Sequence, residues 1–367
     1  MRVLIAPDDF TGTLSAAEAA EAIAAGWRWS APDDALTLLP LSDGGPGFVR
    51  AIAVATDAEM VPVGVRGPMG ETAIGVIGVV GRTAYVESAH GCGLALVHAA
   101  RRDAGSATSS GVGQLVAAAI DSGARTIVVG LGGTASTDGG AGMVAALGAM
   151  GTDAAGAPVE LDIGGARLAD VAAVDLGPAI ERIKDVELIA ATDVDAPLLG
   201  PHGAARGFAP QKGADPEAVE HLEQCLTAFA RACAPAGASL AGQPGAGAGG
   251  GLGFALMLLG ARRVAGIDVV RETVGLDDAI AGSDLVVTGE GSFDWQSLRG
   301  KAVAGLAAAT LDRGCPLVVI AGRVEVGRRE YAALGITAAY AIDEEPGPNP
   351  AAVLARAAAR IADQWSR

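Results

Sequence analysis

The sequence predicts an α/β protein with two domains, one of them formed by both ends of the chain. The length of 367 residues suits two domains of ordinary size. At both ends, short apolar runs alternate with helical segments, which is the pattern of a parallel sheet covered by helices. Between the ends, residues 61–86 alternate valine and isoleucine with glycine, which indicates antiparallel hairpins.

The beginning of the chain has clear local signals. Val3–Ala6 is an apolar run that predicts a strand. Ser15 is expected to cap a helix that reaches about Trp27, because Glu18 completes a capping box. A second strand and a second helix are expected over 35–40 and 47–56.

The same alternation returns near residue 283. Strands are expected there over 285–288, 317–321 and 338–342, and helices over 301–313 and 349–365. In the middle of the chain we expect strands over 126–131 and 186–192 and helices over 112–122, 216–234 and 252–263. The two ends together supply the content of a flavodoxin-like sheet. We therefore expect a discontinuous flavodoxin-like domain of 1–58 and 281–367, and an inserted α/β domain of 59–280 with a mixed sheet.

Composition excludes several kinds of protein. Half of the residues are hydrophobic, which excludes a disordered chain. Lys and Arg number 26 against 42 Asp and Glu, so the net charge of −16 argues against nucleic-acid or membrane partners. The four cysteines lack CxxC spacing, and the first residues predict a strand rather than a signal peptide. We expect a cytoplasmic protein with a small-molecule substrate; the oligomeric state stays open.

Four loops that follow predicted strands carry the candidate chemistry. They contain Asp8, Asp43 with Gly44 and Gly45, Asp193 with Asp195, and Glu290 with Asp294. In open α/β sheets, ligands bind beyond the carboxyl ends of the strands. Asp193 and Asp195 are two residues apart in an extended segment, so both carboxylates can face one ligand, and Mg²⁺ suits such oxygen atoms. Two solvated loop acids are the alternative.

Glycine loops and two lysines complete the pattern. Residues 132–140 and 245–253 are glycine-rich segments whose backbone N–H groups could face an anion. The chain has only three lysines, and two of them, Lys212 and Lys301, lie in short glycine loops. We find no GxSxG motif and no readable Cys–His pair, so covalent catalysis is not indicated. Carboxylates, glycine loops and lysines together favour phosphoryl transfer.

These motifs resemble those of the bacterial class I glycerate kinase family along nearly the whole chain. The matching segments are Ile5–Asp8, Asp43–Gly45, Ala107–Gly113, Val129–Ala135, Asp138–Met143, Thr192–Leu198, Pro210–Ala214, Pro244–Ala248 and Thr288–Gly291. The resemblance implies a flavodoxin-like domain plus a second α/β domain with the active site between them. It also implies transfer of the ATP γ-phosphate to D-glycerate with Mg²⁺, with 2-phosphoglycerate as the expected product.

The resemblance also implies roles for particular residues. Asp43, Asp193, Lys212, Glu290 and Asp294 are the expected catalytic residues, with Mg²⁺ on Asp193 and Asp195. The residues expected to bind substrate or nucleotide are Asp8, Gly44, Gly45, Ser109, Gly132, Gly133, Asp138, Gln211 and Lys301.

Four positions depart from the pattern of the family. Thr11 stands where the family has lysine, and Pro46, Thr137 and Ser292 replace its usual glutamate, asparagine and arginine. Because a cation is lost at Thr11, another cation such as Arg206 or Arg299 is expected to compensate. The alternatives are a kinase for a related 2-hydroxy acid and a non-catalytic protein that binds small acids. A nicotinamide-dependent dehydrogenase is disfavoured, because the first turn lacks a GxGxxG motif.

Overall fold

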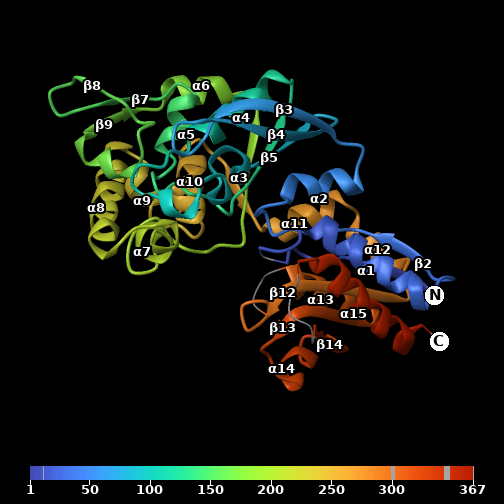
Figure 1. The fold of residues 1–367 in the computed structure, drawn as a ribbon. Helices are drawn as coiled ribbons and strands as arrows, with labels where there is room; N and C mark the ends of the chain where they lie inside the picture. The colour runs from blue at the N-terminus through green and yellow to red at the C-terminus, as the bar shows by residue number, and fades with distance from the viewer. Residues whose placement is uncertain (11, 299–301, 343–347, 367) are drawn as a thin grey trace. The chain divides into compact units, whose positions relative to one another are not determined.

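The computed structural model describes residues 1–10, 12–298, 302–342 and 348–366 (Figure 1). The chain is an α/β protein, and it divides into two compact units. The first unit comprises Met1–Asp43, Arg50–Asp57 and Gly266–Arg367, and the second comprises Gly44–Val49 and Ala58–Ala265. This division differs from the expected boundaries, because residues 266–280 belong with the first unit and 44–49 with the second.

The first unit is built on a five-stranded parallel sheet. Its strands, from edge to edge, are β14 (Ala338–Ala341), β13 (Leu317–Val324), β12 (Leu285–Phe293), β1 (Arg2–Ile5) and β2 (Ala35–Leu38). Numbered within the unit, the order is 2-1-3-4-5, which is the flavodoxin-like order that the sequence predicts. The order reverses between β1 and β12, where Ile5 is in register with Val287.

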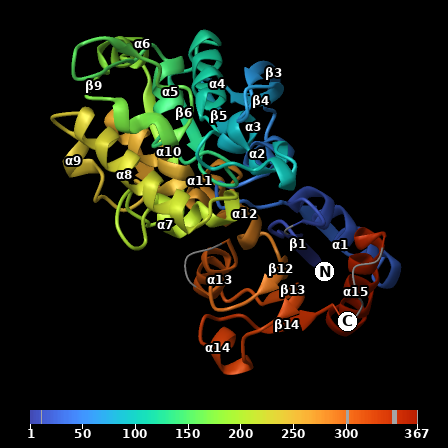
Figure 2. The ribbon, with the colours of Figure 1, turned by 60° about the vertical axis from the view of Figure 1, so that its left-hand side comes forward.

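Helices cover both faces of this sheet. The helices of the unit are α1 (Ala16–Ser30), α11 (Gly266–Thr273), α12 (Leu276–Ala281), α13 (Ala302–Arg313), α14 (Arg328–Ala332) and α15 (Pro350–Trp365), with α2 (Phe48–Ala55) at the boundary. Figure 2 shows α1 and α15 on one side of the sheet and α13 on the other. The predicted capping box is confirmed: Glu18 N donates to Ser15 Oγ over 3.3 Å, and Ser15 N donates to Glu18 Oε2 over 2.9 Å.

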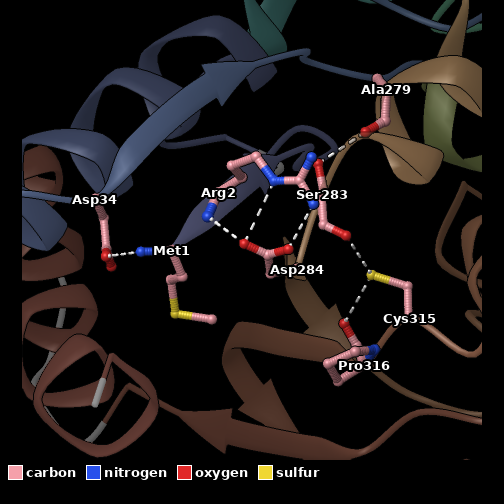
Figure 3. Close-up of polar contacts among 8 residues, drawn as sticks. All are labelled: Met1, Arg2, Asp34, Ala279, Ser283, Asp284, Cys315 and Pro316. Atoms are coloured by element: carbon pink, nitrogen blue, oxygen red, sulfur yellow. Dashed lines mark hydrogen bonds and ion pairs between the residues drawn. The ribbon is translucent and has the colours of Figure 1, made fainter.

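The two central strands of the first unit are joined where they begin (Figure 3). Asp284 Oδ2 accepts from Arg2 N over 2.7 Å, and its Oδ1 accepts from Arg2 Nη2 over 2.7 Å. These bonds lower the pKa of the Asp284 carboxyl to about 2. Beside them, Ser283 Oγ donates to Ala279 O over 2.7 Å, which ties the end of α12 to the start of β12.

The second unit contains a mixed six-stranded sheet. Its order is β11 (Arg262–Val264), β10 (Glu187–Ala191), β6 (Thr126–Gly130), β5 (Thr83–Glu87), β4 (Thr72–Val80) and β3 (Glu59–Arg66). β3, β4 and β5 are antiparallel neighbours, as the alternation of valine and glycine predicts. The strands from β5 to β11 are parallel, so their carboxyl ends meet at one edge.

Helices and a small second sheet complete this unit. The α-helices are α3 (Ser88–Cys92), α4 (Ser110–Asp121), α5 (Ala141–Ala146), α6 (Gly177–Ile183), α7 (Ala204–Phe208), α8 (Pro216–Ala232), α9 (Gly237–Leu240) and α10 (Ala248–Leu258). Short 3₁₀ turns lie at η1 (Leu94–Leu96), η2 (Ala99–Arg101), η3 (Gly165–Asp170) and η4 (Pro210–Lys212). The core between them includes Phe229 and Phe254, whose rings meet edge to face.

Two expectations about elements are corrected, and one small sheet was missed. The helix expected over 252–263 ends at Leu258, because Gly260 is left-handed with φ +85° and Arg262–Val264 joins the sheet as β11. The loop expected from Gly289 is strand as far as Phe293, because it pairs with β13. A three-stranded sheet of β7 (Met150–Thr152), β8 (Pro158–Val159) and β9 (Ala173–Asp175) was not expected. None of the described helices is both long and apolar enough to cross a bilayer.

The packing of α1 on α15 gives a stability prediction. A Cβ atom on Gly26 would lie 1.8 Å from Ala355 O, so the two helices touch through backbone at this point. We expect Gly26→Ala to destabilise the first unit by about 3 kcal/mol or more, because the helices must separate. Ala25→Ser, at the exposed neighbouring position, should have little effect. Urea unfolding of both variants measures this, and equal stabilities would contradict the close contact.

Candidate functional site

A pocket of about 300 Å³ lies within the second unit. Its wall includes Leu131–Thr134, which follow β6, and Val194, which follows β10. The remaining lining residues are Leu94, Phe208, Gln211, Lys212, Ala248, Gly249 and Gly250. The pocket therefore opens at the carboxyl edge of the parallel strands, where α/β sheets bind ligands. It brings together three of the predicted motifs: the glycine loop at 132, the lysine loop at 212 and the glycine run at 249.

Close backbone packing shapes one side of this pocket. Gly249, Gly250 and Gly251 have φ of +62°, +74° and +98°, values that other residues rarely adopt. A Cβ atom on Gly250 would lie 2.0 Å from Ser136 O and 2.9 Å from Lys212 Nζ. Glycine is therefore required here, because any side chain would collide with the loop that holds Lys212.

Lys212 is the buried cation of the pocket. Its Nζ donates to Ser136 O over 2.5 Å and to Thr134 Oγ1 over 3.2 Å. An ammonium group has three N–H donors, so one remains for a ligand. Desolvation lowers the pKa of Lys212 to about 8, and the charges of Cys92 and Asp138 oppose this shift. The amine is thus largely charged at neutral pH, and it is held at a fixed point beside the glycine loop.

Asp138 and Ser109 have an internal role. Both are fully buried, and Asp138 Oδ2 accepts from Ser109 N over 2.8 Å and from Ser109 Oγ over 2.7 Å. Gly140 N and Gly142 N also donate to the Asp138 carboxylate, which joins the starts of α4 and α5. Desolvation raises the pKa of Asp138, and these hydrogen bonds oppose the shift. Neither side chain has exposed surface in this structure, and their hydrogen bonds hold the loop in place; the expected binding role of both residues stays a prediction.

The segment 44–46 packs against the pocket loop. A Cβ atom on Gly130 would lie 2.6 Å from Gly44 O, and one on Gly132 would lie 2.7 Å from Gly45 Cα. Pro46, one of the departures from the family, covers Gly133 with its ring. The four glycines expected to bind a ligand therefore also have a packing role, because close contact leaves no room for a side chain. These are Gly44, Gly45, Gly132 and Gly133.

Sequence analysis missed Glu87, the buried carboxylate that holds this segment. Its two carboxylate oxygen atoms accept from Gly47 N over 3.0 Å and from Val49 N over 3.3 Å, at the start of α2. Desolvation raises the pKa of Glu87. A signal for it was present in the sequence, because Glu87 is an acid at the end of the apolar run Thr83–Glu87. The four loops singled out as candidates also place acids after apolar runs.

The two candidate metal ligands differ in their surroundings. Asp193 is partly buried just beyond β10, whereas the Asp195 side chain is 79% exposed and its Oδ1 lies 2.5 Å from Arg263 Nη2. In the described part of the chain, no three Asp, Glu, His or Cys residues form a metal centre. Mg²⁺ commonly takes one or two carboxylates and completes its shell with phosphate oxygens and water. The donor chemistry therefore fits Mg²⁺ at Asp193, while Asp195 would first have to leave Arg263.

A cluster of carboxylates lies at the switch point of the first unit. Asp8 lies just beyond β1, where its N–H donates to Gly289 O over 2.8 Å, and Glu290 lies within β12 next to Gly289. Desolvation raises the pKa of Asp8 well above its usual range, and the charges of Asp43, Asp9 and Glu290 raise it further. The structure thus brings the predicted residues Asp8, Asp43 and Glu290 within electrostatic reach of one another.

Other candidates stand apart from these two groups. The Asp294 carboxylate closes its own turn, where Gln296 N donates to its Oδ1 over 2.7 Å. Lys301, Thr11 and Arg299 lie outside the described residues. Arg206, one of the cations expected to compensate for Thr11, is held by Glu220 over 2.8 Å and lies 3.6 Å from Glu223. The Thr137 hydroxyl is buried, and within the described chain it has no hydrogen-bond partner.

Comparison with known proteins places this two-unit α/β fold among kinases that act on small molecules. The chain belongs to the glycerate kinase family, whose model matches residues 3–367. It is 40% identical over 354 residues to a glycerate kinase of Bacillus subtilis, covering 95% of this chain and 92% of that protein. It is 41% identical over 326 residues to a glycerate 2-kinase of Escherichia coli, covering 88% and 85%.

A solved structure agrees with this assignment. The crystal structure of a protein provisionally named glycerate kinase 2, from Salmonella typhimurium LT2, matches with a TM-score of 0.83 and 36% identity. The match covers 100% of this chain and 98% of that chain. The family and the fold that the sequence predicts are therefore confirmed.

The low pKa of Lys212 makes a stability prediction whose sign can be worked out. Between pH 8 and about 10.4 the folded chain releases this proton, whereas an unfolded lysine keeps it, so stability rises with pH. Relative to Lys212→Met, the wild type should gain about 2 kcal/mol between pH 8 and pH 9.5. Both proteins contain the same buried cysteines, so the effect of cysteine titration cancels when the two free energies of unfolding are subtracted. Urea unfolding at both pH values measures it; a constant difference would mean that Lys212 is not desolvated.

Proposed function

We propose that the chain transfers the γ-phosphate of ATP to D-glycerate and forms 2-phosphoglycerate with the help of Mg²⁺. Family membership supports glycerate as the acceptor and ATP as the donor. The observation that carries the proposal in this chain is the pocket of glycine backbone around Lys212. A fixed ammonium group among small residues suits phosphoryl transfer, because catalysis there is mainly positioning and charge neutralisation.

In this proposal Lys212 holds an anionic oxygen of a reactant with its remaining donor. Gln211 and Thr134, beside it in the wall, supply neutral hydrogen bonds that orient the ligand. The apolar residues Leu94, Leu131 and Phe208 exclude water around them. Asp138, Ser109 and Glu87 keep these loops in place from behind, as positioning residues.

Asp193 is the carboxylate that would hold Mg²⁺, with Asp195 as a second candidate once it leaves Arg263. When bound, Mg²⁺ neutralises charge on the phosphate oxygens. The proton of the acceptor hydroxyl must go to a base as the new O–P bond forms and the bond to ADP breaks. Asp8, Asp43 and Glu290, which form one carboxylate group of the first unit, are our candidates for that base. Burial and the neighbouring like charges raise the pKa of Asp8 well above its usual range, and a raised pKa is the direction that favours a carboxylate as a base.

A coupled assay of ATP consumption tests this function. D-Glycerate should give turnover that depends on Mg²⁺, and phosphorus NMR of the product should show 2-phosphoglycerate. Turnover with another 2-hydroxy acid in preference to D-glycerate would favour a related kinase. Binding of D-glycerate without ATP consumption would favour the non-catalytic alternative.

A cytoplasmic location belongs to the same proposal, and four free cysteines in the described chain agree with a reducing compartment.

The two metal candidates are separated by a matched pair of substitutions. Asp193→Asn should lower kcat/KM at least a hundredfold, about 2.7 kcal/mol of transition-state stabilisation. Asp195→Asn should lower it less than tenfold, because this exposed carboxylate is already neutralised by Arg263. Kinetics at several Mg²⁺ concentrations measure both variants, with circular dichroism as the control for folding. If Asp193→Asn keeps near-normal turnover, Asp193 is not the metal ligand.

A further inference from the structure

The pocket in the second unit carries little charge. Among the described residues that line it, Lys212 is the only one with an ionisable side chain. Its buried ammonium group lies 3.2 Å from Thr134 Oγ1 and 2.5 Å from Ser136 O, and both partners are neutral. A charged ligand that leaves water for such a pocket needs an opposite charge of similar size. One cation therefore suits a ligand with one negative charge, such as a carboxylate, better than a triphosphate with several.

Carboxylates are absent from the described part of this wall. Asp138, the acid of the glycine loop, accepts from Ser109 and from backbone N–H groups instead. Since Mg²⁺ in phosphate sites is usually bound through one or two carboxylates, a nucleotide with its Mg²⁺ meets no metal ligand among these residues. Asp193 directly precedes the lining residue Val194 in the chain but does not line the pocket itself. The volume agrees, because about 300 Å³ is at the lower end for small-molecule pockets, roughly 300–1,000 Å³.

Neutral donors lie beside the ammonium group. Gly249 and Gly250 line the pocket, and among the residues that the structure describes neither backbone N–H group has a hydrogen-bond partner. Gly250 is close to Lys212, because a Cβ atom there would lie 2.9 Å from Lys212 Nζ. The Thr134 hydroxyl accepts from Lys212, so its own proton remains for a ligand. Buried N–H groups such as that of Gly250 are rarely left unpaired, so this side of the pocket suits an anionic oxygen.

We propose that this pocket is the acceptor site, in which Lys212 and the N–H groups of Gly249 and Gly250 hold the carboxylate of a short hydroxy acid. The triphosphate of ATP then lies outside the pocket wall. The inference rests on the proposed function and assigns one of its two reactants to the pocket. Gln211 and the Thr134 hydroxyl can each donate and accept, which suits the hydroxyl groups of such an acid. The substrate class that follows is a small monocarboxylic hydroxy acid.

Three variants separate the two reactants. Lys212→Met removes the cation, Thr134→Val removes the neighbouring hydroxyl, and Lys184→Met removes an exposed lysine that is paired with Glu181. We expect Lys212→Met to raise the Kd of D-glycerate about tenfold to a hundredfold, which is the effect of one lost charge-assisted bond. The Kd of ATP should stay within about twofold, because its phosphates do not meet this lysine. Thr134→Val should raise the Kd of D-glycerate by about twofold to tenfold, and Lys184→Met should change neither constant.

Calorimetric titration measures these constants, with D-glycerate added to the protein alone and to the protein with Mg²⁺ and a non-hydrolysable ATP analogue. Methyl D-glycerate, the neutral ester, separates a contact with the carboxylate from a merely structural role. The ester should bind the wild type at least tenfold more weakly than the acid does, and Lys212→Met should change its affinity less than twofold. An equal loss for acid and ester would overturn the inference, as would a loss of affinity for ATP while D-glycerate still binds normally.

Turnover keeps this inference distinct from the proposed kinase activity. If D-glycerate binds in a way that depends on Lys212 and no ATP is consumed, the acceptor site stands and the kinase proposal fails. If ATP is consumed with D-glycerate while Lys212→Met raises only the KM of ATP, the kinase proposal stands and the acceptor site is wrong. If D-glycerate does not bind the wild type with or without the nucleotide analogue, both proposals are contradicted.

Discussion

The direct contact of backbone with backbone around Lys212 is the constraint on which the site in the second unit depends. The loop after β6 carries Ser136, whose carbonyl oxygen both accepts from Lys212 and faces Gly250 at a distance that leaves no room for a Cβ atom. The ammonium group is therefore already fixed by its neighbours, so ligand binding does not have to order it. Such preorganisation is what charge neutralisation in phosphoryl transfer needs.

The same frame explains why carboxylates and cations occupy different places. Buried acids such as Asp138 and Glu87 accept backbone N–H groups and hold the loops together. Lys212 is left with neutral acceptors, so its charge stays available to an anion. A carboxylate bonded directly to Lys212 would neutralise it and close the site. An acidic protein can in this way keep a local positive charge against the sign of its net charge.

Much of the fold was readable from the sequence, because its signals are local. The capping box at Ser15 and the alternation in β3 and β4 need only neighbouring residues. The wrong predictions concern segments whose structure depends on a distant strand. Residues 262–264 were predicted as the end of a helix but pair with β10 as β11, and Gly289–Phe293 was predicted as a loop but is strand because it pairs with β13. In the site, residue type predicted Lys212 and the glycine loops. Residue type could not distinguish Asp138, whose side chain is fully buried, from Asp193, which is only partly buried, because both residues come after predicted strands.

Hydrogen–deuterium exchange with and without ligand tests most directly whether this pocket binds the reactants. Amides of 132–134, 211–213 and 248–250 should exchange more slowly when D-glycerate and ATP with Mg²⁺ are added, because these segments line the pocket and its lysine turn. Helix α8, which begins beyond that turn and does not line the pocket, should show no comparable change. If calorimetry shows that the ligands bind while all three segments exchange as in the free protein, the ligands bind elsewhere and the account of the site is contradicted.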